Sequence, residues 1–565
     1  MRAVTVLPFP VGLLRRSFPL AAAVLVALGG PSLRAQSDGL PRGCHEMPYV
    51  RYEAEAGSAG GGAISRTAFD FDPAKTASEA SNRHYLGLPV NGAYVQWTVT
   101  NVSDGVTLRF TLPDNAAGDG VSGSLEVQIN GAKVKTIYPG SYWAWTYFVS
   151  SHPQNTPGAR PRMRFDEIHF GLPAKLQPGD VLKLVKTNGD AYEYGIDFVE
   201  LEEVPPALGK PAGFVSVTDH GASGTDGYSD SAAFQNAWAA AKAAGTGLYI
   251  PPGRFLLQYQ WWLGDTTNLA IQGAGIWHTE VFFSTKAVGG GGIYAGANTE
   301  NLDISHFFMG SALNERHIVP GQVSNYKAFD GAFGSGSSIH HMWITHFEAG
   351  TWCGEYAAPI RVTENFDFAH NRVRGTYADG VNFTQGTRYS TVRQCSFRDN
   401  GDDAMAVWPD NTAGAPEARH NTFRNNTVEF LYRAGGAGIF GGFGHEIHHN
   451  LFVDGTDSSG VRFTEDFPGY HFENNTQIRV YENTFIGRGT SLDLWNQPQG
   501  AIQISGEGVR HVYFENNDIL DSPRHAIQLR GGTTLFFTNM AVRVTWLDST
   551  NAPGGAAIRQ YELGS

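Results

Sequence analysis

The sequence predicts an all-β protein in which a β-sandwich is followed by a β-solenoid. The 565 residues include 69 glycines, 12% aromatic residues and only 17% charged residues, which is typical of turn-rich β proteins. Short alternating strands occupy the first third of the chain, and a short motif recurs through the remainder. The length exceeds that of one ordinary domain, so we expect separate cores for the two regions.

Residues 1–35 are predicted to be a secretory signal peptide. Arg2, Arg15 and Arg16 precede the apolar run PLAAAVLVALGG, and small residues follow up to Ala35. This run is too short for a permanent membrane span, and no later stretch is apolar enough for one. We therefore expect a secreted or periplasmic protein. The net charge of -13 and the lack of a basic patch with interleaved aromatic residues make nucleic acid an unexpected partner.

Residues 48–204 are predicted to form the β-sandwich. The segments YVQWTVTNV, VTLRFTLP, SLEVQINGAKVKTIY and VLKLVKT have strand character, and Asn130-Gly131 predicts a tight hairpin turn. The proline- and glycine-rich residues 204–213 are predicted to be a linker. After it, Ser229 or Asp230 can cap a helix through AAFQNAWAAAKAA that ends at Gly245.

Residues 213–565 are predicted to form the solenoid. The motifs HNRV, QCSF, NNTV, HNLF, ENTF and NNDI place one polar or small residue at the same turn of successive coils, at Asn371, Cys395, Asn426, Asn450, Asn483 and Asn517. Stacked asparagines can hydrogen-bond one another and the backbone, so we predict a structural ladder. Its one cysteine, Cys395, is expected to be a buried small residue rather than a nucleophile.

A second ladder precedes the strands GVNF, AMAV, GIFG, GVRF, AIQI and AIQL, and only two adjacent coils place an acid there. These acids are Asp379 and Asp403, 24 residues apart, and Asp402 lies beside them in sequence but points differently. Neighbouring strands lie about 4.8 Å apart, so three carboxyl groups should crowd one small area. Such crowding costs stability, and folds tolerate it for a metal or for acid/base chemistry. The alternative is a solvated acidic turn.

The sandwich region opens with YEAEAG and closes with GIDFVELEEV, and in this it resembles the carbohydrate-binding modules of families 6 and 35. The resemblance implies a structural calcium ion held by Glu53, Glu55 and Asp197, and hard oxygen ligands suit this ion. The alternative is that these acids are solvated strand-end charges. No cofactor is expected for catalysis.

The segment from VTDHGASGTDGYSD to GLYIPPG resembles the entry of pectin-lyase-like right-handed β-helices, and YADGVNF and RDNGDDAMAVW look most like glycoside hydrolase family 87. That family contains α-1,3-glucanases (mutanases) and mycodextranases. The resemblance covers roughly residues 213–545 and implies a right-handed parallel β-helix that hydrolyses a neutral α-glucan with inversion. It implies that Asp402 is the general acid and that Asp379 and Asp403 hold the attacking water. Acid and base would then stand roughly 6.5–9.5 Å apart.

Other functions are distinguished by the residues that their active sites would require. Dextranase- and isopullulanase-like enzymes share the fold, and polygalacturonases add a histidine and an Arg-x-Lys pair. Ala437 and Thr464 stand where that histidine and lysine would fall, so a charged uronate would lose its partner. A polysaccharide lyase or epimerase usually needs a basic residue at the cleft, and a non-catalytic glycan-binding β-helix has no reason to keep three crowded acids.

The expected partner is a polysaccharide or oligosaccharide bound by a monomer. Trp408, at the end of the strand after the acidic pair, is the first candidate for a sugar platform, and Tyr377 is a weaker one. Arg462, Glu465 and Asp466 lie two coils beyond Asp403 and either line subsites or form a structural salt bridge.

Overall fold

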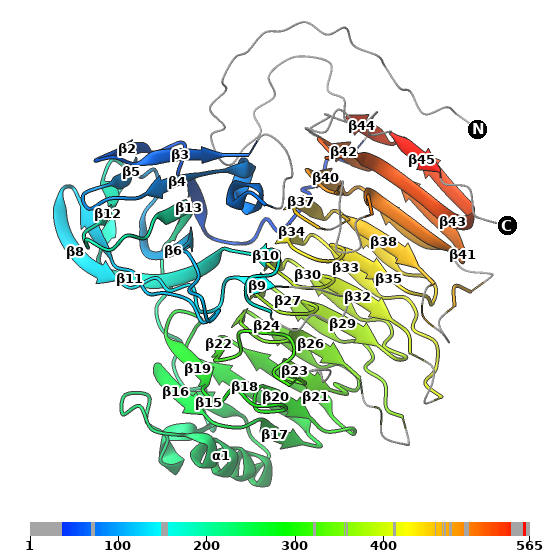
Figure 1. The fold of residues 1–565 in the computed structure, drawn as a ribbon. Helices are drawn as coiled ribbons and strands as arrows, with labels where there is room; N and C mark the ends of the chain where they lie inside the picture. Colours follow the sequence, from blue (N-terminus) through cyan, green and yellow to red (C-terminus); the bar gives the residue numbers. More distant parts are fainter. Residues whose placement is uncertain are drawn as a thin grey trace, which may run out of the picture. The chain divides into compact units, whose positions relative to one another are not determined.

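The computed structural model describes residues 37–68, 74–147, 156–319, 324–354, 356, 360–410, 414–457, 459–465, 467, 471–473, 477–490, 497–543 and 557–560. They form two compact units (Figure 1). The first comprises the described parts of residues 48–204. The second comprises residues 37–47 and the described part of the chain from residue 205 onward. The predicted signal peptide lies outside the described residues.

The first unit is a β-sandwich of two antiparallel sheets, as predicted. One sheet contains β1 (Val50–Glu53), β3 (Ile64–Thr67), β4 (His84–Leu88), β6 (Ser103–Thr111), β11 (Asp166–Leu176) and β13 (Tyr194–Glu202). The other contains β2 (Ser58–Gly60), β5 (Tyr94–Thr98), β7 (Leu125–Ile129), β8 (Ala132–Ile137) and β12 (Val181–Lys186). A short hairpin pairs β9 (Thr146–Tyr147) with β10 (Pro161–Met163).

The alternation of apolar and polar residues along the strands explains the core of this sandwich. Val95, Leu108, Leu184 and Ile196 are fully buried and belong to one apolar cluster between the sheets. The predicted hairpin joins β7 to β8 through Asn130, whose φ is 51°, and a following glycine of φ 83°. Positive φ at both turn positions is what a tight Asn-Gly turn requires, so this prediction is confirmed.

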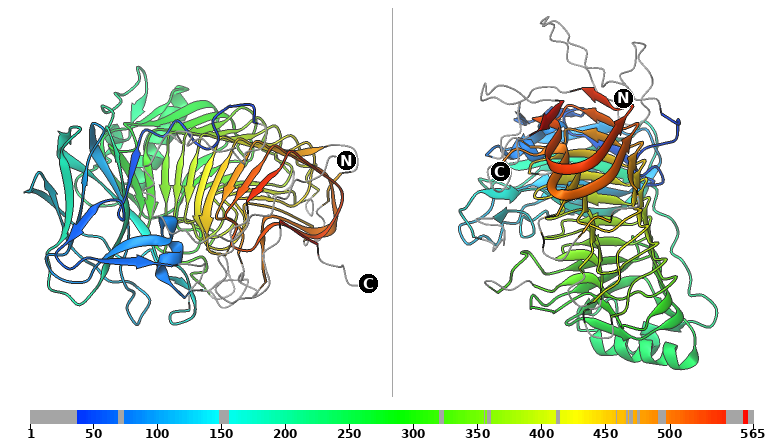
Figure 2. Two further views of the ribbon diagram at one scale, coloured as in Figure 1. Left: turned by 90° about the horizontal axis from the view of Figure 1, so that it is seen from above. Right: turned by 90° about the vertical axis from the view of Figure 1, so that its right-hand side faces the viewer.

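The second unit is a right-handed parallel β-helix, as predicted, with three strand faces that repeat along the coils (Figures 1 and 2). The first face contains β17 (Trp261–Gly264), β20 (Ile293–Ala295), β23 (Lys327–Gly331), β26 (Ala349–Cys353), β29 (Val381–Thr384), β32 (Met405–Trp408), β35 (Ala437–Ile439), β38 (Val461–Thr464), β41 (Gly500–Glu515), β43 (His525–Thr538) and β45 (Ile558–Gln560).

The other two faces complete each coil. The second contains β14 (Val215–Ser216), β15 (Leu248–Ile250), β18 (Thr267–Gly273), β21 (Glu300–Ser305), β24 (Ser338–His340), β27 (Asp367–Ala369), β30 (Thr391–Arg393), β33 (Thr422–Arg424), β36 (Glu446–His448) and β39 (Ile478–Tyr481). The third contains β16 (Gly253–Leu257), β19 (Thr279–Phe283), β22 (Phe308–Ser311), β25 (Trp343–Thr345), β28 (Arg372–Arg374), β31 (Ser396–Arg398), β34 (Thr427–Leu431), β37 (Leu451–Gly455), β40 (Thr484–Ile486), β42 (Asp518–Leu520) and β44 (Ala541–Arg543).

Helix α1 (Ser231–Ala244) lies at the N-terminal end of the coils (Figure 1). It ends at Gly245 in the left-handed conformation, as predicted. Asp230 occupies the N-cap position, but its carboxylate accepts the backbone N–H groups of Ser223 and Leu256 instead of capping the helix. The buried helix residues Phe234 and Trp238 both contact Trp261, so the helix covers the first coil.

The predicted asparagine ladder is present and fully buried. Asn450 donates its backbone N–H and its side-chain amide to Oδ1 of Asn483, at 3.0 Å in both cases, and Asn483 repeats the pattern on Asn517. Cys395 occupies one place in this ladder, where its backbone N–H donates to Oδ1 of Asn426. The ladder therefore supplies hydrogen bonds at the turn between the second and third faces.

Residues 37–47 run along the turns of the β-helix, which the sequence did not predict. Arg42 forms ion pairs with Glu482 at 2.6 Å and Asp518 at 2.8 Å. Farther along, Gly43 donates its N–H to the His449 carbonyl, and Glu46 pairs with His370 at 3.0 Å. The segment therefore bridges several coils.

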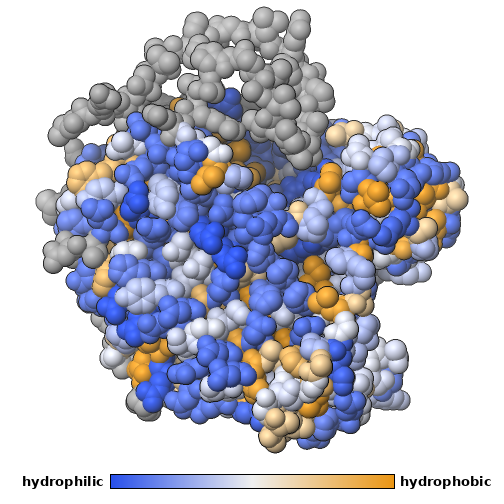
Figure 3. Space-filling view, turned by 180° about the vertical axis from the view of Figure 1, so that it is seen from behind, coloured by the Kyte–Doolittle hydropathy of each residue, from blue (hydrophilic) through white to orange (hydrophobic). Residues whose placement is uncertain are grey.

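The surface contains both hydrophobic and hydrophilic residues. On the face drawn in Figure 3, hydrophobic residues form small groups among hydrophilic ones. Within the described part of the chain, no helix has the length and apolar character needed to cross a bilayer.

Candidate active site

The three predicted acids meet on the first face of the β-helix. Val381 of β29 pairs with Met405 of β32, so Asp379 and Asp403 precede adjacent strands at equivalent places. One carboxyl oxygen from each of Asp379, Asp402 and Asp403 lies within 4.8 Å of the others. These three residues are called the acid triad below.

Two members of the acid triad are buried and one is accessible. Asp379 and Asp403 are 6% and 2% exposed, whereas the side chain of Asp402 is 21% exposed. Asp379 accepts a hydrogen bond from the side-chain amide of Asn382 at 3.0 Å. Asp403 accepts the backbone N–H of Gly435 at 2.6 Å.

Burial and mutual repulsion raise the pKa of both buried carboxyl groups. Burial raises the pKa of Asp379 well above its usual range, and the charges of Asp402 and Asp403 raise it further. Burial raises the pKa of Asp403 to about 7, and the charge of Asp402 adds to this while Arg462 opposes it. The acid triad therefore holds at least one proton near neutral pH.

Two arginines that the sequence analysis missed neutralise the accessible acid. Arg316 and Arg433 each donate from Nη1 to Oδ2 of Asp402, at 2.7 Å and 2.8 Å. Arg316 lies between β22 and β23, and Arg433 lies between β34 and β35. No local pattern distinguishes either residue, because each comes from a different coil.

The carboxyl groups of the acid triad lie close together. One oxygen of each carboxyl group lies within 4.8 Å of the others. The prediction that the three carboxyl groups crowd one small area is therefore confirmed. The two arginines explain the approach, because they offset the repulsion that would otherwise separate the carboxylates.

Two glycines make room for Asp403. A Cβ atom on Gly438 of β35 would lie 2.3 Å from Oδ2 of Asp403, and one on Gly435 would lie 2.9 Å from Oδ1. Neither glycine has a positive φ, so the close approach of the carboxylate, rather than backbone conformation, requires them here.

The predicted sugar-binding residues have different surroundings. Trp408 is partly exposed and contacts Trp352 and Phe467, with ring centroids 5.4 Å and 6.3 Å away. It remains available as a platform. Tyr377 is fully buried, so the prediction that it can stack on a sugar is wrong.

The acidic group two coils beyond Asp403 is only partly described. Arg462 is partly exposed, stacks over Phe440 at 5.3 Å and acts electrostatically on Asp403. Among the described residues, no ion pair joins Arg462 to Glu465, whose carboxyl group lies against Gly508. Asp466 lies outside the described residues.

The predicted calcium ligands gather at one edge of the sandwich. Ser81 donates its hydroxyl to Glu53 and its backbone N–H to Asp197, and Asn82 donates to Glu55. Oε2 of both Glu53 and Glu55 is buried without a hydrogen-bond partner. Carboxylate oxygens without a hydrogen-bond partner are suited to binding a cation, and Glu53 and Glu55 would be the ligands of a calcium ion here.

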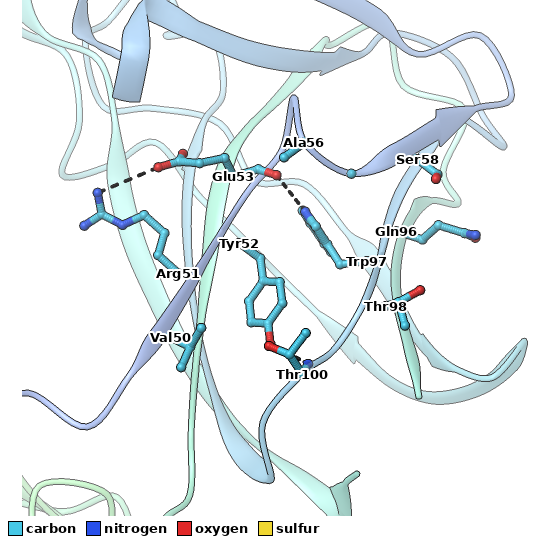
Figure 4. A pocket seen from close by; sticks show the side chains of 11 residues that line it. Val50, Arg51, Tyr52, Glu53, Ala56, Ser58, Gln96, Trp97, Thr98 and Thr100 are labelled. Atoms are coloured by element: carbon cyan, nitrogen blue, oxygen red, sulfur yellow. Dashed lines mark hydrogen bonds and ion pairs between the residues drawn. The ribbon is translucent and has the colours of Figure 1, made fainter. Parts of the chain in front are cut away.

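Asp197, the third predicted calcium ligand, already forms an ion pair with an arginine. Asp197 is fully buried and pairs with the equally buried Arg109 at 2.5 Å. In Figure 4 the Glu53 carboxyl group points toward Arg51 and away from Trp97, whose indole N–H donates to the Glu53 carbonyl. Glu53 also lines a pocket of about 390 Å³ beside Trp97.

Comparisons with known proteins agree with this architecture. A family profile described as "Alpha-1,3-glucanase catalytic domain D1" matches residues 46–204, and one described as "Alpha-1,3-glucanase catalytic domain D2" matches residues 225–484. Among solved structures, the Agl-KA catalytic domain is 44% identical to this chain, covers 92% of this chain and 93% of its own, and has a TM-score of 0.86.

Two further structures are more distant. The catalytic unit of a thermostable GH87 alpha-1,3-glucanase from Streptomyces thermodiastaticus strain HF3-3 is 27% identical over 89% of this chain and 87% of its own, with a TM-score of 0.73. A GH87 alpha-1,3-glucanase catalytic domain in complex with nigerose is 20% identical over 94% of this chain and 99% of its own, with a TM-score of 0.73, and this likeness concerns the fold. A comparison with curated proteins found no match.

Proposed function

This chain belongs to the α-1,3-glucanases of glycoside hydrolase family 87, and we propose that it hydrolyses the α-1,3 bonds of a neutral glucan at the acid triad. It is a glycoside hydrolase by that membership. The observation that carries the site assignment is the convergence of Asp379, Asp402 and Asp403 from adjacent coils to within 4.8 Å.

Asp402 is proposed as the general acid because it is the accessible carboxyl group. Arg316 and Arg433 both bind its Oδ2, and no hydrogen bond of the described structure occupies its Oδ1. When Asp402 gives a proton to the leaving glycosidic oxygen, the two guanidinium groups stabilise the carboxylate that forms. Arg316 and Arg433 are thus positioned to lower the barrier to proton transfer.

The proton itself is proposed to come from the stacked pair. In the substrate-free protein the two arginines stabilise Asp402 as a carboxylate, while the raised pKa values of Asp379 and Asp403 retain a proton there. Substrate binding then shifts this proton to Asp402 and leaves the stacked carboxylates to hold the attacking water.

Inversion is supported by the number of carboxyl groups rather than by their spacing. A retaining enzyme uses one carboxylate as its nucleophile, and a second as acid and base. Here two stacked carboxyl groups accompany the acid, and a pair of acceptors is suited to orienting a water molecule. Inversion predicts that the first product is the β anomer.

The direct test compares four polysaccharides: insoluble α-1,3-glucan, dextran, nigeran and polygalacturonate. We expect new reducing ends from α-1,3-glucan and none from dextran or polygalacturonate, because Thr464 offers no cation to a uronate. Nigeran shows whether alternating linkages are accepted. Release from dextran or polygalacturonate with none from α-1,3-glucan would overturn the proposal.

We also propose a structural calcium ion at Glu53 and Glu55, export directed by residues 1–35, and a monomeric enzyme. The orphaned Oε2 atoms support the first of these. Sequencing the N-terminus of secreted protein tests the second, and a start before residue 36 would contradict it. Sedimentation of the purified enzyme tests the third.

A further inference from the structure

One outward-facing row of residues connects the acid triad with the N-terminal coils. On the first face, Trp262 pairs with Tyr294, Tyr294 with Asp330, Asp330 with Trp352, and Trp352 with Asn382. Their strands, β17, β20, β23, β26 and β29, follow one another along the β-helix (Figure 1). Each coil contributes one residue to this row, and the register shift between β17 and β20 comes only after Trp262.

The row reaches the acid triad itself. Asn382 donates its amide to Asp379, and Gly438, which continues the same row through Ala406, lies against Oδ2 of Asp403. Trp352 contacts Trp408, the predicted platform beside the triad. The row and the acid triad therefore share one face of the β-helix.

An aromatic pair occupies the far end of the row. Trp262 is 56% exposed, although its neighbours Trp261 and Leu263 are buried at 3% and 2%. Its ring lies 4.6 Å from that of Tyr294, centroid to centroid, at an interplanar angle of 32°. Two large aromatic rings left at the surface, beyond what the core uses, mark an interaction site more often than a packing element.

The distance from this pair to the acid triad suits a polymer. Four coil steps of about 4.8 Å separate Trp262 from Asn382, which is roughly 19 Å along the row. The proposed substrate is a long neutral chain, and aromatic rings offer apolar faces to the C–H groups of a sugar without requiring charge. A chain bound across the acid triad can therefore continue along the row to the aromatic pair.

We propose that Trp262 and Tyr294 form an accessory binding site for the same glucan chain that is cleaved at the acid triad. This inference rests on the proposed function. The site holds polymer that extends beyond the catalytic subsites and keeps the enzyme on an insoluble substrate. A trisaccharide spanning the acid triad is too short to reach it.

The test separates polymer binding from chemistry. Trp262→Ala and Trp262→Leu are made both in the active enzyme and with Asp402→Asn, so that binding to insoluble α-1,3-glucan is measured without cleavage. We expect the dissociation constant for the particles to rise about 3- to 10-fold for both variants, because leucine keeps bulk but lacks a flat face. Turnover of an α-1,3-linked trisaccharide should stay within about twofold of the wild-type rate.

Tyr228→Ala is the matched control. Tyr228 is 77% exposed but lies before α1 and outside the row, so its loss should change neither binding nor turnover. The inference is overturned if the Trp262 variants bind particles like the parent, if trisaccharide turnover falls as much as polymer binding, or if Tyr228→Ala causes the same loss. Failure of the proposed function is a different result, because the wild-type enzyme would then cleave neither trisaccharide nor polymer.

Discussion

At the scale of single residues, the acid triad combines one solvent-facing carboxyl group with two buried ones. Arg316 and Arg433 compensate the charge of Asp402 from outside, while Asp379 and Asp403 keep their positions through Asn382 and Gly435. Each carboxyl group therefore has its own set of partners, and the three can be separated by substitution.

Replacing Asp379, Asp402 or Asp403 individually by Asn should lower kcat at least about 10²-fold, since the shape remains and the proton chemistry is lost. Melting temperature checks that each variant folds. NMR of the product formed by the wild-type enzyme should show the β anomer first. An active Asp402→Asn enzyme, or an α anomer as first product, would refute the assignment.

Asp403 should also make stability depend on pH. Its pKa is about 7 in the folded protein against about 3.9 in an unfolded chain, so the folded state binds this proton more tightly. The resulting stabilisation is complete below about pH 4 and is lost as the pH rises through 7. Asp403→Asn should therefore melt at an increasingly higher temperature than the wild type between pH 4 and pH 8.

The exposed Asp226 provides the control for that measurement. Asp226→Asn should melt in parallel with the wild type at every pH. A constant difference between Asp403→Asn and the wild type over the same range would show that Asp403 does not carry a raised pKa.

Gly438→Ala should inactivate the enzyme without unfolding it. The new Cβ atom would meet Oδ2 of Asp403 at 2.3 Å, and displacing a catalytic group by about 1 Å can cost on the order of 10²-fold in rate. Gly171 is a strand glycine whose nearest Cβ neighbour is 4.0 Å away, so Gly171→Ala should keep full activity. Equal kcat values for both variants would contradict the role assigned to Gly438.

At the scale of elements, the sandwich edge that carries Glu53 and Glu55 should respond to calcium. Burial raises their pKa values to about 8 and about 7 in the absence of metal, so protons compete with the ion at low pH. Calcium should raise the melting temperature of the sandwich at pH 8 and have a smaller effect at pH 5.5.

The double variant Glu53→Gln, Glu55→Gln should abolish this calcium response, whereas Glu203→Gln, at an exposed position, should retain it. Calorimetry with calcium and with chelator makes the comparison. A melting temperature that is the same with and without calcium at pH 8 would contradict the calcium proposal.

The repeated elements were predictable because their signals are local and recur. The asparagine ladder, the Asn130-Gly131 turn and the end of α1 at Gly245 each follow from residue types at fixed positions. The stacking of Asp379 on Asp403 follows from the same period. Arg316 and Arg433 were not predictable, because they reach Asp402 from loops of other coils, and Arg316 precedes it by 86 residues.

Tyr377 is a residue that the sequence wrongly predicted to be part of the site. Its place beside Asp379 suggested a surface aromatic, yet its side chain is fully buried. Loops between coils lack the alternation that tells inward from outward in a strand, so sequence alone could not decide. The crowding of the acid triad was predicted from the coil period, whereas the two arginines that offset its repulsion were not.

At the scale of the whole molecule, residues 37–47 pair with residues of the β-helix that lie hundreds of positions later in the chain. Arg42 pairs with Glu482 across 440 residues, so this partner is synthesised long after Arg42 itself. At about 5–20 residues per second, the ribosome needs on the order of tens of seconds to close that interval. Contacts so distant in sequence form late, after the coils between them have stacked. Arg42 can therefore dock only after the coils that carry Glu482 and Asp518 have been synthesised and stacked.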